Sequence, residues 1–190
     1  MSALHLTLAS ASPRRHELIA RLGIAPDAIV AANIDETPLR DELPRAYAIR
    51  MAREKTLVVD RAGHVLGGDT VVAAGRRILP KAESEESARR CLELLSGRRH
   101  RVLSAVALRA PDGSVRERLS ETVVRFKVLS QQEISSYLVG GEWHGKAGGY
   151  AIQGSAEGLI QWIRGSHSGV MGLPLFETRT LLKAAGFALD

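Results

Sequence analysis

The strand-to-helix junction near the start of the chain most constrains how it can fold. Three leucines alternate with polar residues over positions 4–8, which is the pattern of a half-buried strand. Ser12 is a natural N-cap, and Pro13 suits the first helical position because its missing N–H would have no partner there. Gly23 is typical of the end of a helix. The sequence therefore predicts a strand that leads directly into a helix.

Two adjacent arginines, Arg14 and Arg15, fall in the first turn of this predicted helix. The helix dipole disfavours positive charge at that end by roughly 0.3–1 kcal/mol per residue. Cations placed there suggest that an anion binds nearby.

The length of 190 residues suits a single domain with a substantial core, and we expect one domain over residues 1–190. No run of apolar residues approaches the roughly 20 needed to span a bilayer, and residues 1–25 lack the apolar core of a secretory signal. We therefore expect a cytoplasmic protein. The single cysteine, Cys91, cannot form an internal disulfide. It is expected to be a buried residue of a helix.

The net charge of +5 is compatible with a nucleic-acid partner or with a small anionic substrate. Only five of the 26 basic residues are lysines, and three of these lie in short polar or glycine-bearing stretches. A lysine supplies a compact, rotatable charge that a phosphate site can use, although codon bias alone could also leave so few. The lysines are Lys55, Lys81, Lys127, Lys146 and Lys183.

The remaining periodicity predicts an α/β fold with a mixed central sheet flanked by helices, because isolated strands and hairpin-linked strands both occur. A turn at 74–77 indicates a hairpin, and another turn at 111–113 indicates an antiparallel pair. The expected helices are 12–22, 44–62, 84–95, 130–139 and 174–185, and the expected strands are 4–8, 65–73, 102–109, 116–128 and 159–163.

Asp69 is the strongest single candidate for chemistry. It follows Gly67 and Gly68 in an apolar run, and paired glycines allow another group to approach the backbone closely. We expect Asp69 to end a buried strand, at the edge of the sheet where α/β proteins bind ligands. The alternative is that Asp69 only caps the following turn.

Two further carboxylates, Asp35 and Glu36, lie in a loop and are weaker candidates alone. Together with the cations, however, they suit magnesium-assisted attack on a polyphosphate, in which oxygen ligands hold the metal and cations neutralise developing charge. The cations in question are Arg14, Arg15, Lys55 and Lys81.

The glycine-rich stretch 145–154 follows a near match to the P-loop pattern, which ends at Lys146. We reject the P-loop because a helix is predicted before the pattern and Ala147 stands where the motif needs Ser or Thr. The stretch could cradle a ligand with its backbone N–H groups, or it could be an ordinary surface loop. The six histidines show no metal-ligand spacing, and no Ser-His-Asp order stands out.

Several motifs in order resemble the Maf family of nucleoside triphosphate pyrophosphatases, from Leu6 to about Gly186. They are residues 10–15, 68–70, Lys81, 95–102, 145–154 and 172–175. The sequence departs from the usual family pattern at Gly68, Ala82 and His167.

This resemblance implies hydrolysis of a nucleoside triphosphate between the α and β phosphates, with a divalent cation, Mg²⁺ or Mn²⁺. It implies a fold similar to that of the inosine triphosphate pyrophosphatases, with a central cleft, and a homodimer. The stretch through Gln153 resembles the branch that acts on dTTP and UTP. An amide offers both a donor and an acceptor to a pyrimidine edge.

The resemblance also assigns roles to individual residues. Asp69 matches the proton acceptor, and Asp69 with Glu36 is expected to hold the metal. Arg14, Thr70 and Gln153 match the positions associated with base selectivity. The other residues expected in the cleft are Ser12, Arg15, Glu36, Lys55 and Lys81.

A nonenzymatic function is the competing hypothesis, in which the basic surface binds nucleic acid or a cell-division partner, since Maf proteins are also linked to septum formation. The basic residues are scattered, however, and no basic run is interleaved with aromatic residues as stacking surfaces require. We therefore expect a nucleoside triphosphate as the partner, with neither a stable nucleic-acid partner nor a membrane.

Overall fold

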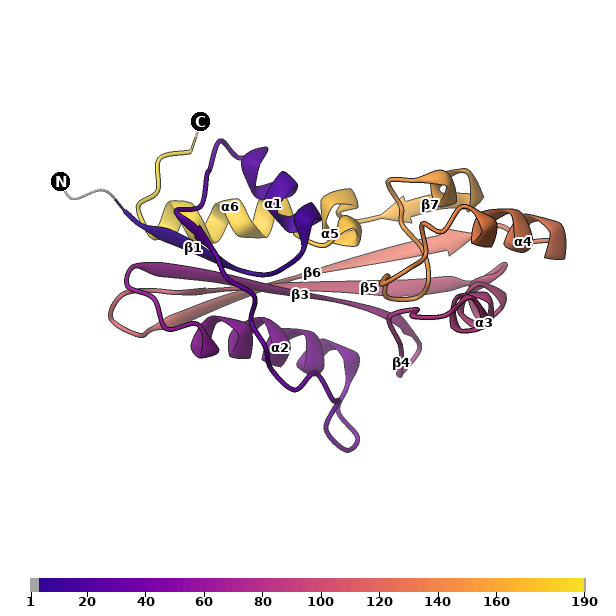
Figure 1. Ribbon diagram of the computed structural model, residues 1–190, viewed down its shortest axis with the longest axis horizontal. Coiled ribbons are helices and arrows are strands. Elements are labelled where there is room, and N and C mark those ends of the chain that lie inside the picture. Colours follow the sequence, from indigo (N-terminus) through magenta and orange to yellow (C-terminus); the bar gives the residue numbers. More distant parts are fainter. Residues whose placement is uncertain (1–3, 190) are drawn as a thin grey trace.

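The computed structural model describes residues 4–189 and contains one mixed seven-stranded sheet with helices on both faces (Figure 1). This confirms the predicted α/β class and the mixed, helix-flanked sheet. The strands are β1 (Leu6–Ala9), β2 (Ala28–Ile29), β3 (His64–Ala74), β4 (Arg77–Leu79), β5 (Arg99–Arg109), β6 (Val115–Phe126) and β7 (Ile160–Arg164). The helices are α1 (Pro13–Ala20), α2 (Pro44–Val58), α3 (Glu85–Leu95), α4 (Gln131–Val139), α5 (His167–Met171) and α6 (Leu175–Ala184), with a 3₁₀ turn at Ser155–Leu159.

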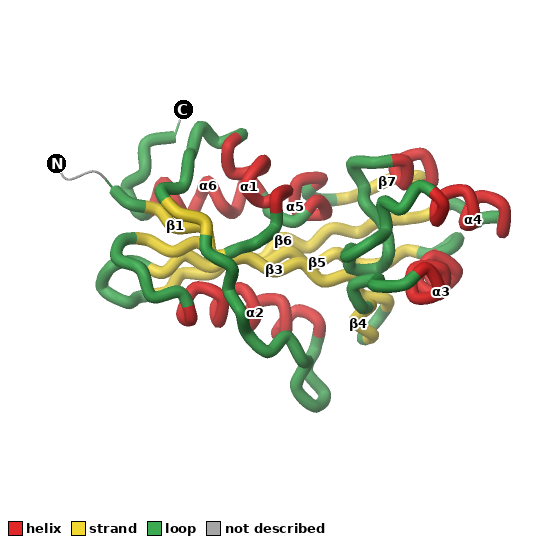
Figure 2. The backbone as a smooth tube through the Cα atoms, in the orientation of Figure 1, coloured by secondary structure: helices red, strands yellow, loops and turns green. Residues whose placement is uncertain are grey.

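The sheet has the order β2-β1-β3-β5-β6-β7, and β4 pairs with β3. The strand β1 runs parallel to its neighbours β2 and β3, whereas all other pairs are antiparallel. The long strands β3, β5 and β6 run through the elongated molecule and connect its two ends (Figure 2). They form the rigid support on which the shorter elements sit.

Both faces of the central strands are buried. Alternate residues of β5 point to opposite sides, so that Val102 and Val106 join the larger core cluster while Leu103 and Ala105 join the cluster beneath α2. The helix α2 covers one face, and α1, α5 and α6 lie over the other (Figure 1). The continuous apolar runs of β3 and β5 follow from this double burial.

The paired glycines of β3 allow the close approach that the sequence predicted. A Cβ on Gly67 would lie 2.6 Å from the carbonyl oxygen of Ala52 and 2.8 Å from Cγ2 of Thr56, both on α2. A Cβ on Gly68 would meet only ordinary contacts, the nearest being 3.4 Å from the Ala105 carbonyl oxygen. Gly67 is therefore the residue that lets α2 pack directly on β3.

The structure corrects three local expectations. The helix predicted to reach residue 62 ends at Val58, because the chain must straighten before β3 begins. Ser12 occupies the N-cap position of α1, but its side chain makes no capping hydrogen bond. The five-residue helix α5 was not predicted, because its glycine-containing sequence is too short to show helical periodicity.

Candidate active site

A gap in strand pairing opens the cleft. Along one edge of β3, pairing with β1 stops at Gly67 and pairing with β4 starts only at Val72. Asp69 lies on this unpaired edge, in the middle of β3. The expectation that it ends the strand is wrong, because antiparallel pairing with β5 continues past it and holds β3 straight. The carboxylate is nevertheless at the point where the parallel part of the sheet stops.

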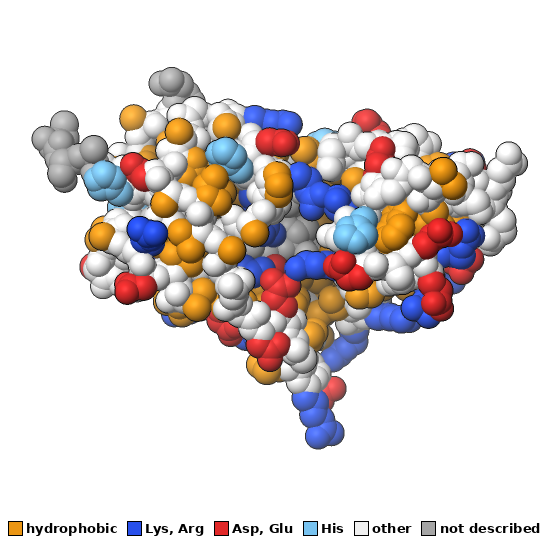
Figure 3. Space-filling view, in the orientation of Figure 1, with side chains coloured by type: hydrophobic (Ala, Val, Ile, Leu, Met, Phe, Trp, Pro, Cys, Tyr) orange, Lys and Arg blue, Asp and Glu red, His pale blue; other side chains and the backbone are white. Residues whose placement is uncertain are grey.

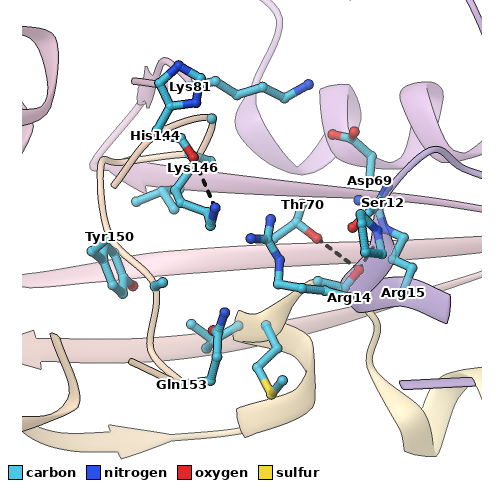
Figure 4. A pocket seen from close by; sticks show the side chains of 18 of the residues that line it. Ser12, Arg14, Arg15, Asp69, Thr70, Lys81, His144, Lys146, Tyr150 and Gln153 are labelled. Carbon is cyan, nitrogen blue, oxygen red and sulfur yellow. Dashed lines mark hydrogen bonds between the residues drawn. The ribbon is translucent and has the colours of Figure 1, made fainter. Parts of the chain in front are cut away.

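The gap leads into a cavity of about 350 Å³ between the start of α1, β3, the 144–153 loop and α5 (Figure 4). Lys and Arg side chains gather around the central hollow on this face of the molecule (Figure 3). Of the predicted site residues, the cavity is lined by Ser12, Arg14, Arg15, Lys55, Asp69, Thr70, Lys81 and Gln153. Glu36 lines an adjoining pocket that shares Asp69, Thr70 and Lys81 with the cavity.

Lys55 contacts two of the predicted carboxylates, Glu36 and Asp69. Together with Lys81, these residues form what we call the floor of the cleft. The Nζ of Lys55 lies 2.7 Å from Oδ1 of Asp69 and 2.7 Å from Oε1 of Glu36. Lys81 donates to the other oxygen of Glu36, at 2.6 Å. Lys55 and Asp69 are both buried, at 5% and 6% exposure, so their pairing offsets the cost of removing each charge from water.

The loop that carries Glu36 is held by α2. The hydroxyl of Tyr47 donates to the Glu36 carbonyl oxygen at 2.7 Å. Burial acts to raise the pKa of the Glu36 carboxyl, but hydrogen bonds from Lys55 and Lys81 outweigh it and lower that pKa to about 2. Burial, helped by the negative charge of Asp69, raises the pKa of Tyr47 to about 12. Glu36 is thus a charged carboxylate held beside Asp69.

Arg15 and Thr70 are fixed by the backbone after α5. Arg15 Nε donates to the Gly172 carbonyl oxygen at 2.9 Å, and its Nη1 donates to Ser10 Oγ at 3.2 Å. The Thr70 hydroxyl donates to the same carbonyl at 3.3 Å and shares a 2.9 Å hydrogen bond with Ser104. Burial lowers the pKa of Arg15, while the charge of Asp69 acts in the opposite direction. Both side chains are therefore oriented before any ligand binds.

Unlike Arg15 and Thr70, three side chains of the cavity make no hydrogen bond or ion pair to the protein within residues 4–189. They are Arg14, Ser12 and Gln153. Arg14 and Gln153 extend into the cavity from opposite sides (Figure 4). Burial lowers the pKa of Arg14. The structure thus leaves the donors of Arg14 available to a ligand.

The glycine-rich loop is not an anion cradle built from backbone N–H groups. The amides of Gly145 and Gly148 donate to the carbonyls of Ala82 and Pro80, and the amide of Gly149 donates to the Lys146 carbonyl. Helix α4 precedes the P-loop-like pattern and no α-helix begins where that pattern ends, at Lys146, which confirms the rejection of a P-loop. Its glycines instead allow tight packing, since a Cβ on Gly148 would lie 2.8 Å from Val72.

Three polar side chains that line the cavity were not predicted as site residues: His144, Lys146 and Tyr150. Tyr150 is buried and its hydroxyl shares a 2.8 Å hydrogen bond with His100 Nε2. Lys146 could have been found, because it is one of only five lysines and stands within the glycine-rich stretch. The short helix α5, whose following carbonyl at Gly172 orients Arg15, gave no comparable signal.

A solvent-accessible cleft in which two carboxylates lie among several cations is the type of site found in enzymes that cleave phosphoanhydrides. Residues 5–185 match the family model described as Maf-like protein, and the chain belongs to the Maf family. This confirms the resemblance found in the sequence motifs.

Curated relatives match almost the whole chain. The dTTP/UTP pyrophosphatase of Novosphingobium aromaticivorans is 63% identical over 184 residues, which cover 95% of this chain and 92% of the relative. The dTTP/UTP pyrophosphatase of Rhodospirillum rubrum is 58% identical, covering 96% and 88% of the two chains. That of Zymomonas mobilis subsp. mobilis is 57% identical, covering 99% and 95%.

Likeness to solved structures is partial. The Ham1 protein of Staphylococcus aureus matches 64% of this chain and 71% of its own, with 14% identity and a TM-score of 0.45. A dITP/XTP pyrophosphatase of Mycobacterium abscessus matches 65% and 73%, with 16% identity and a TM-score of 0.43.

Proposed function

We propose that this chain hydrolyses dTTP and UTP to the nucleoside monophosphate and pyrophosphate. The relatives named above as dTTP/UTP pyrophosphatases support this assignment, because they are more than half identical to this chain along nearly its full length. The observation that carries the proposal is the position of Asp69, a buried carboxylate held by Lys55 at the floor of a cleft lined with cations.

In the proposed reaction, a water oxygen forms a bond to the α phosphorus while the bond from that phosphorus to the α–β bridging oxygen breaks. Pyrophosphate leaves with the bridging oxygen. Asp69 accepts the proton of the attacking water, and its Oδ2 is available for this because only Oδ1 is hydrogen-bonded within residues 4–189. Arg14, Arg15, Lys55 and Lys81 balance the charge of the triphosphate, as the sequence prediction holds.

The carboxylates of Glu36 and Asp69 fit a divalent cation such as Mg²⁺ or Mn²⁺, because both are hard oxygen donors on one side of the cleft. No group of three or more His, Cys, Asp or Glu side chains in the described part of the chain could hold a metal by itself. A pair of carboxylates suits Mg²⁺, which commonly takes one or two protein carboxylates and completes its shell with water and phosphate oxygens. When bound, such an ion neutralises phosphate charge.

Selectivity for pyrimidines is assigned to Gln153, with Thr70 and Arg14 nearby in the same cavity. The Gln153 side chain is exposed to the cavity and offers one acceptor and two donors to the edge of a base. Thr70 is held by Ser104 and by the Gly172 carbonyl, so it provides a fixed wall rather than an adjustable contact.

A panel of dTTP, UTP, CTP, ATP and GTP, assayed with Mg²⁺ and with Mn²⁺, tests the function. We expect dTTP and UTP to be turned over well above the purine nucleotides, with monophosphate and pyrophosphate as products. Phosphate released only after addition of an inorganic pyrophosphatase identifies cleavage between the α and β phosphates. A preference for purines, or orthophosphate as the first product, would contradict the proposal.

No helix among the described residues is long and apolar enough to cross a membrane. We propose a single-domain enzyme that acts in the cytoplasm as a homodimer, and light scattering on the purified chain tests the assembly.

A further inference from the structure

Lys146 and Arg14 face one another across the cleft from opposite walls. Arg14 extends from the first turn of α1, Lys146 extends from the 144–153 loop, and both charged ends point into the same space (Figure 4). Among residues 4–189, neither side chain forms an ion pair with a carboxylate. The charge of Glu17 acts on Arg14 without forming an ion pair. Two cations that face each other, neither of them paired to a carboxylate, form a site for an anion.

The backbone around Lys146 is fixed, so only its side chain can respond to a ligand. Its N–H donates to the Trp143 carbonyl, and its carbonyl accepts from Ala82 at 3.0 Å. Nζ donates to the His144 carbonyl at 2.9 Å, which leaves two of its three donors for the cleft. The loop thus presents the ammonium group at a defined place.

The charges around Lys146 act on it in opposite directions. Burial lowers the pKa of Lys146, the charge of Arg14 lowers it further, and the charge of Glu142 acts in the opposite direction. Glu142 itself accepts the Ser155 amide at 2.9 Å, so its carboxylate is engaged elsewhere. An anion between Arg14 and Lys146 would offset the repulsion between these two cations.

The donors at this position select the chemical class of the anion. An ammonium and a guanidinium group provide only donors and no acceptor. A pyrimidine edge mixes donors with acceptors and suits Gln153, whereas a phosphate group provides only acceptors. The pair therefore suits a phosphate better than a base.

We propose that Lys146 and Arg14 bind the pyrophosphate portion of the substrate, that is, its β and γ phosphates, which assigns Arg14 to the phosphates rather than to base selectivity. This inference rests on the proposed function. The residue next to Lys146, Ala147, pairs with Lys81 through the backbone, so Lys146 lies on the same side of the cleft as the Lys81 backbone. Asp69 and Lys55 address the α phosphate from the floor, which leaves the donors on the walls for the leaving group.

Product inhibition separates this role from others. In Lys146→Met, we expect inhibition by inorganic pyrophosphate to weaken about tenfold, as for the loss of a charge-assisted hydrogen bond, and KM for dTTP to rise similarly. Inhibition by thymidine monophosphate should stay within about twofold of wild type, because that product lacks the β and γ phosphates. Lys146→Arg restores the charge and should recover most of the pyrophosphate inhibition.

Lys183→Met is the matched control, since Lys183 is an exposed lysine in the last turn of α6. It should leave both inhibition constants unchanged, and urea unfolding should show that Lys146→Met folds as stably as wild type. The inference would be overturned if Lys146→Met weakened inhibition by both products equally, or weakened inhibition by neither. Failure of wild type to hydrolyse dTTP and UTP would instead overturn the proposed function.

Discussion

Two lysines of the same cleft have opposite surroundings. Lys55 is buried, and its ammonium group lies 2.7 Å from a carboxylate oxygen on each of two residues, Glu36 and Asp69. Lys146 is half-buried, faces Arg14 and contacts a backbone carbonyl instead of a carboxylate. The floor of the cleft is therefore balanced in charge, whereas its walls, which carry Arg14 and Lys146, are not.

This difference separates what the fold stabilises from what the ligand stabilises. The two carboxylates and two lysines at the floor form three ion pairs without substrate, and such preorganised charges need little rearrangement during reaction. The wall cations repel each other until an anion binds. Variants at the floor should mainly affect catalysis and folding, and variants at the walls should mainly affect binding.

Asp69→Asn should have the largest effect. The amide cannot accept a proton from water, so kcat for dTTP should fall by about 10²–10⁴, the usual contribution of a general base. The fold should persist, because asparagine has the same shape and can still contact Lys55. Release of phosphate in the presence of an added inorganic pyrophosphatase measures kcat.

Asp60→Asn is the control for Asp69→Asn, since Asp60 is exposed and lies between α2 and β3, outside the cleft. Turnover by Asp69→Asn within about threefold of wild type would remove Asp69 from the base role, since general base catalysis contributes much more than that.

The contrast between floor and walls was only partly accessible from the sequence. Asp69 could be identified because a carboxylate within an apolar, glycine-containing run is unusual. Lys55 is in the second half of the predicted helix 44–62, but its distance to Asp69 depends on α2 packing against Gly67, which no local pattern encodes. Periodicity therefore predicts the elements but not the ion pairs between them.

Long-range contacts explain the remaining errors. Asp69 was placed at a strand end because α/β proteins bind ligands at that edge of the sheet, yet pairing with β5 keeps β3 extended beyond it. Arg15 is oriented by a carbonyl at Gly172, more than 150 residues later, after a helix too short to predict. Such contacts are decided by the tertiary arrangement, whereas the start of the predicted helix 130–139 depends on a local capping box between Ser130 and Glu133.

A comparison of two neighbouring arginines should show the next largest effect. Arg15→Ala removes hydrogen bonds to Gly172 and Ser10 and should lower the free energy of unfolding by about 2 kcal/mol. Arg14→Ala removes an unpaired cation from the first turn of α1 and should leave stability within about 0.5 kcal/mol, or raise it slightly. Urea unfolding without ligand measures both; equal destabilisation would show that Arg14 is also held by the fold.

The smallest expected effect is a pH-dependent contribution of Glu36 to stability. Its pKa is lowered to about 2, below the ordinary 4.5, so the charged form is favoured in the folded protein. The stabilisation should therefore be complete above about pH 5 and should be lost as the pH falls from 4.5 toward 2. Because Glu36 is partly exposed and screened by solvent, we expect less than about 1 kcal/mol.

Urea unfolding of wild type and Glu36→Gln at about pH 6, 4 and 2.5 checks this expectation. The difference between the two proteins should be largest at the highest pH and nearly vanish at the lowest. Glu93→Gln, on the exposed side of α3, gives the background for removing a carboxylate from this chain. A difference that persists unchanged in acid would mean that Glu36 supports the loop through packing alone, and the floor of the cleft would then not be held together by charge.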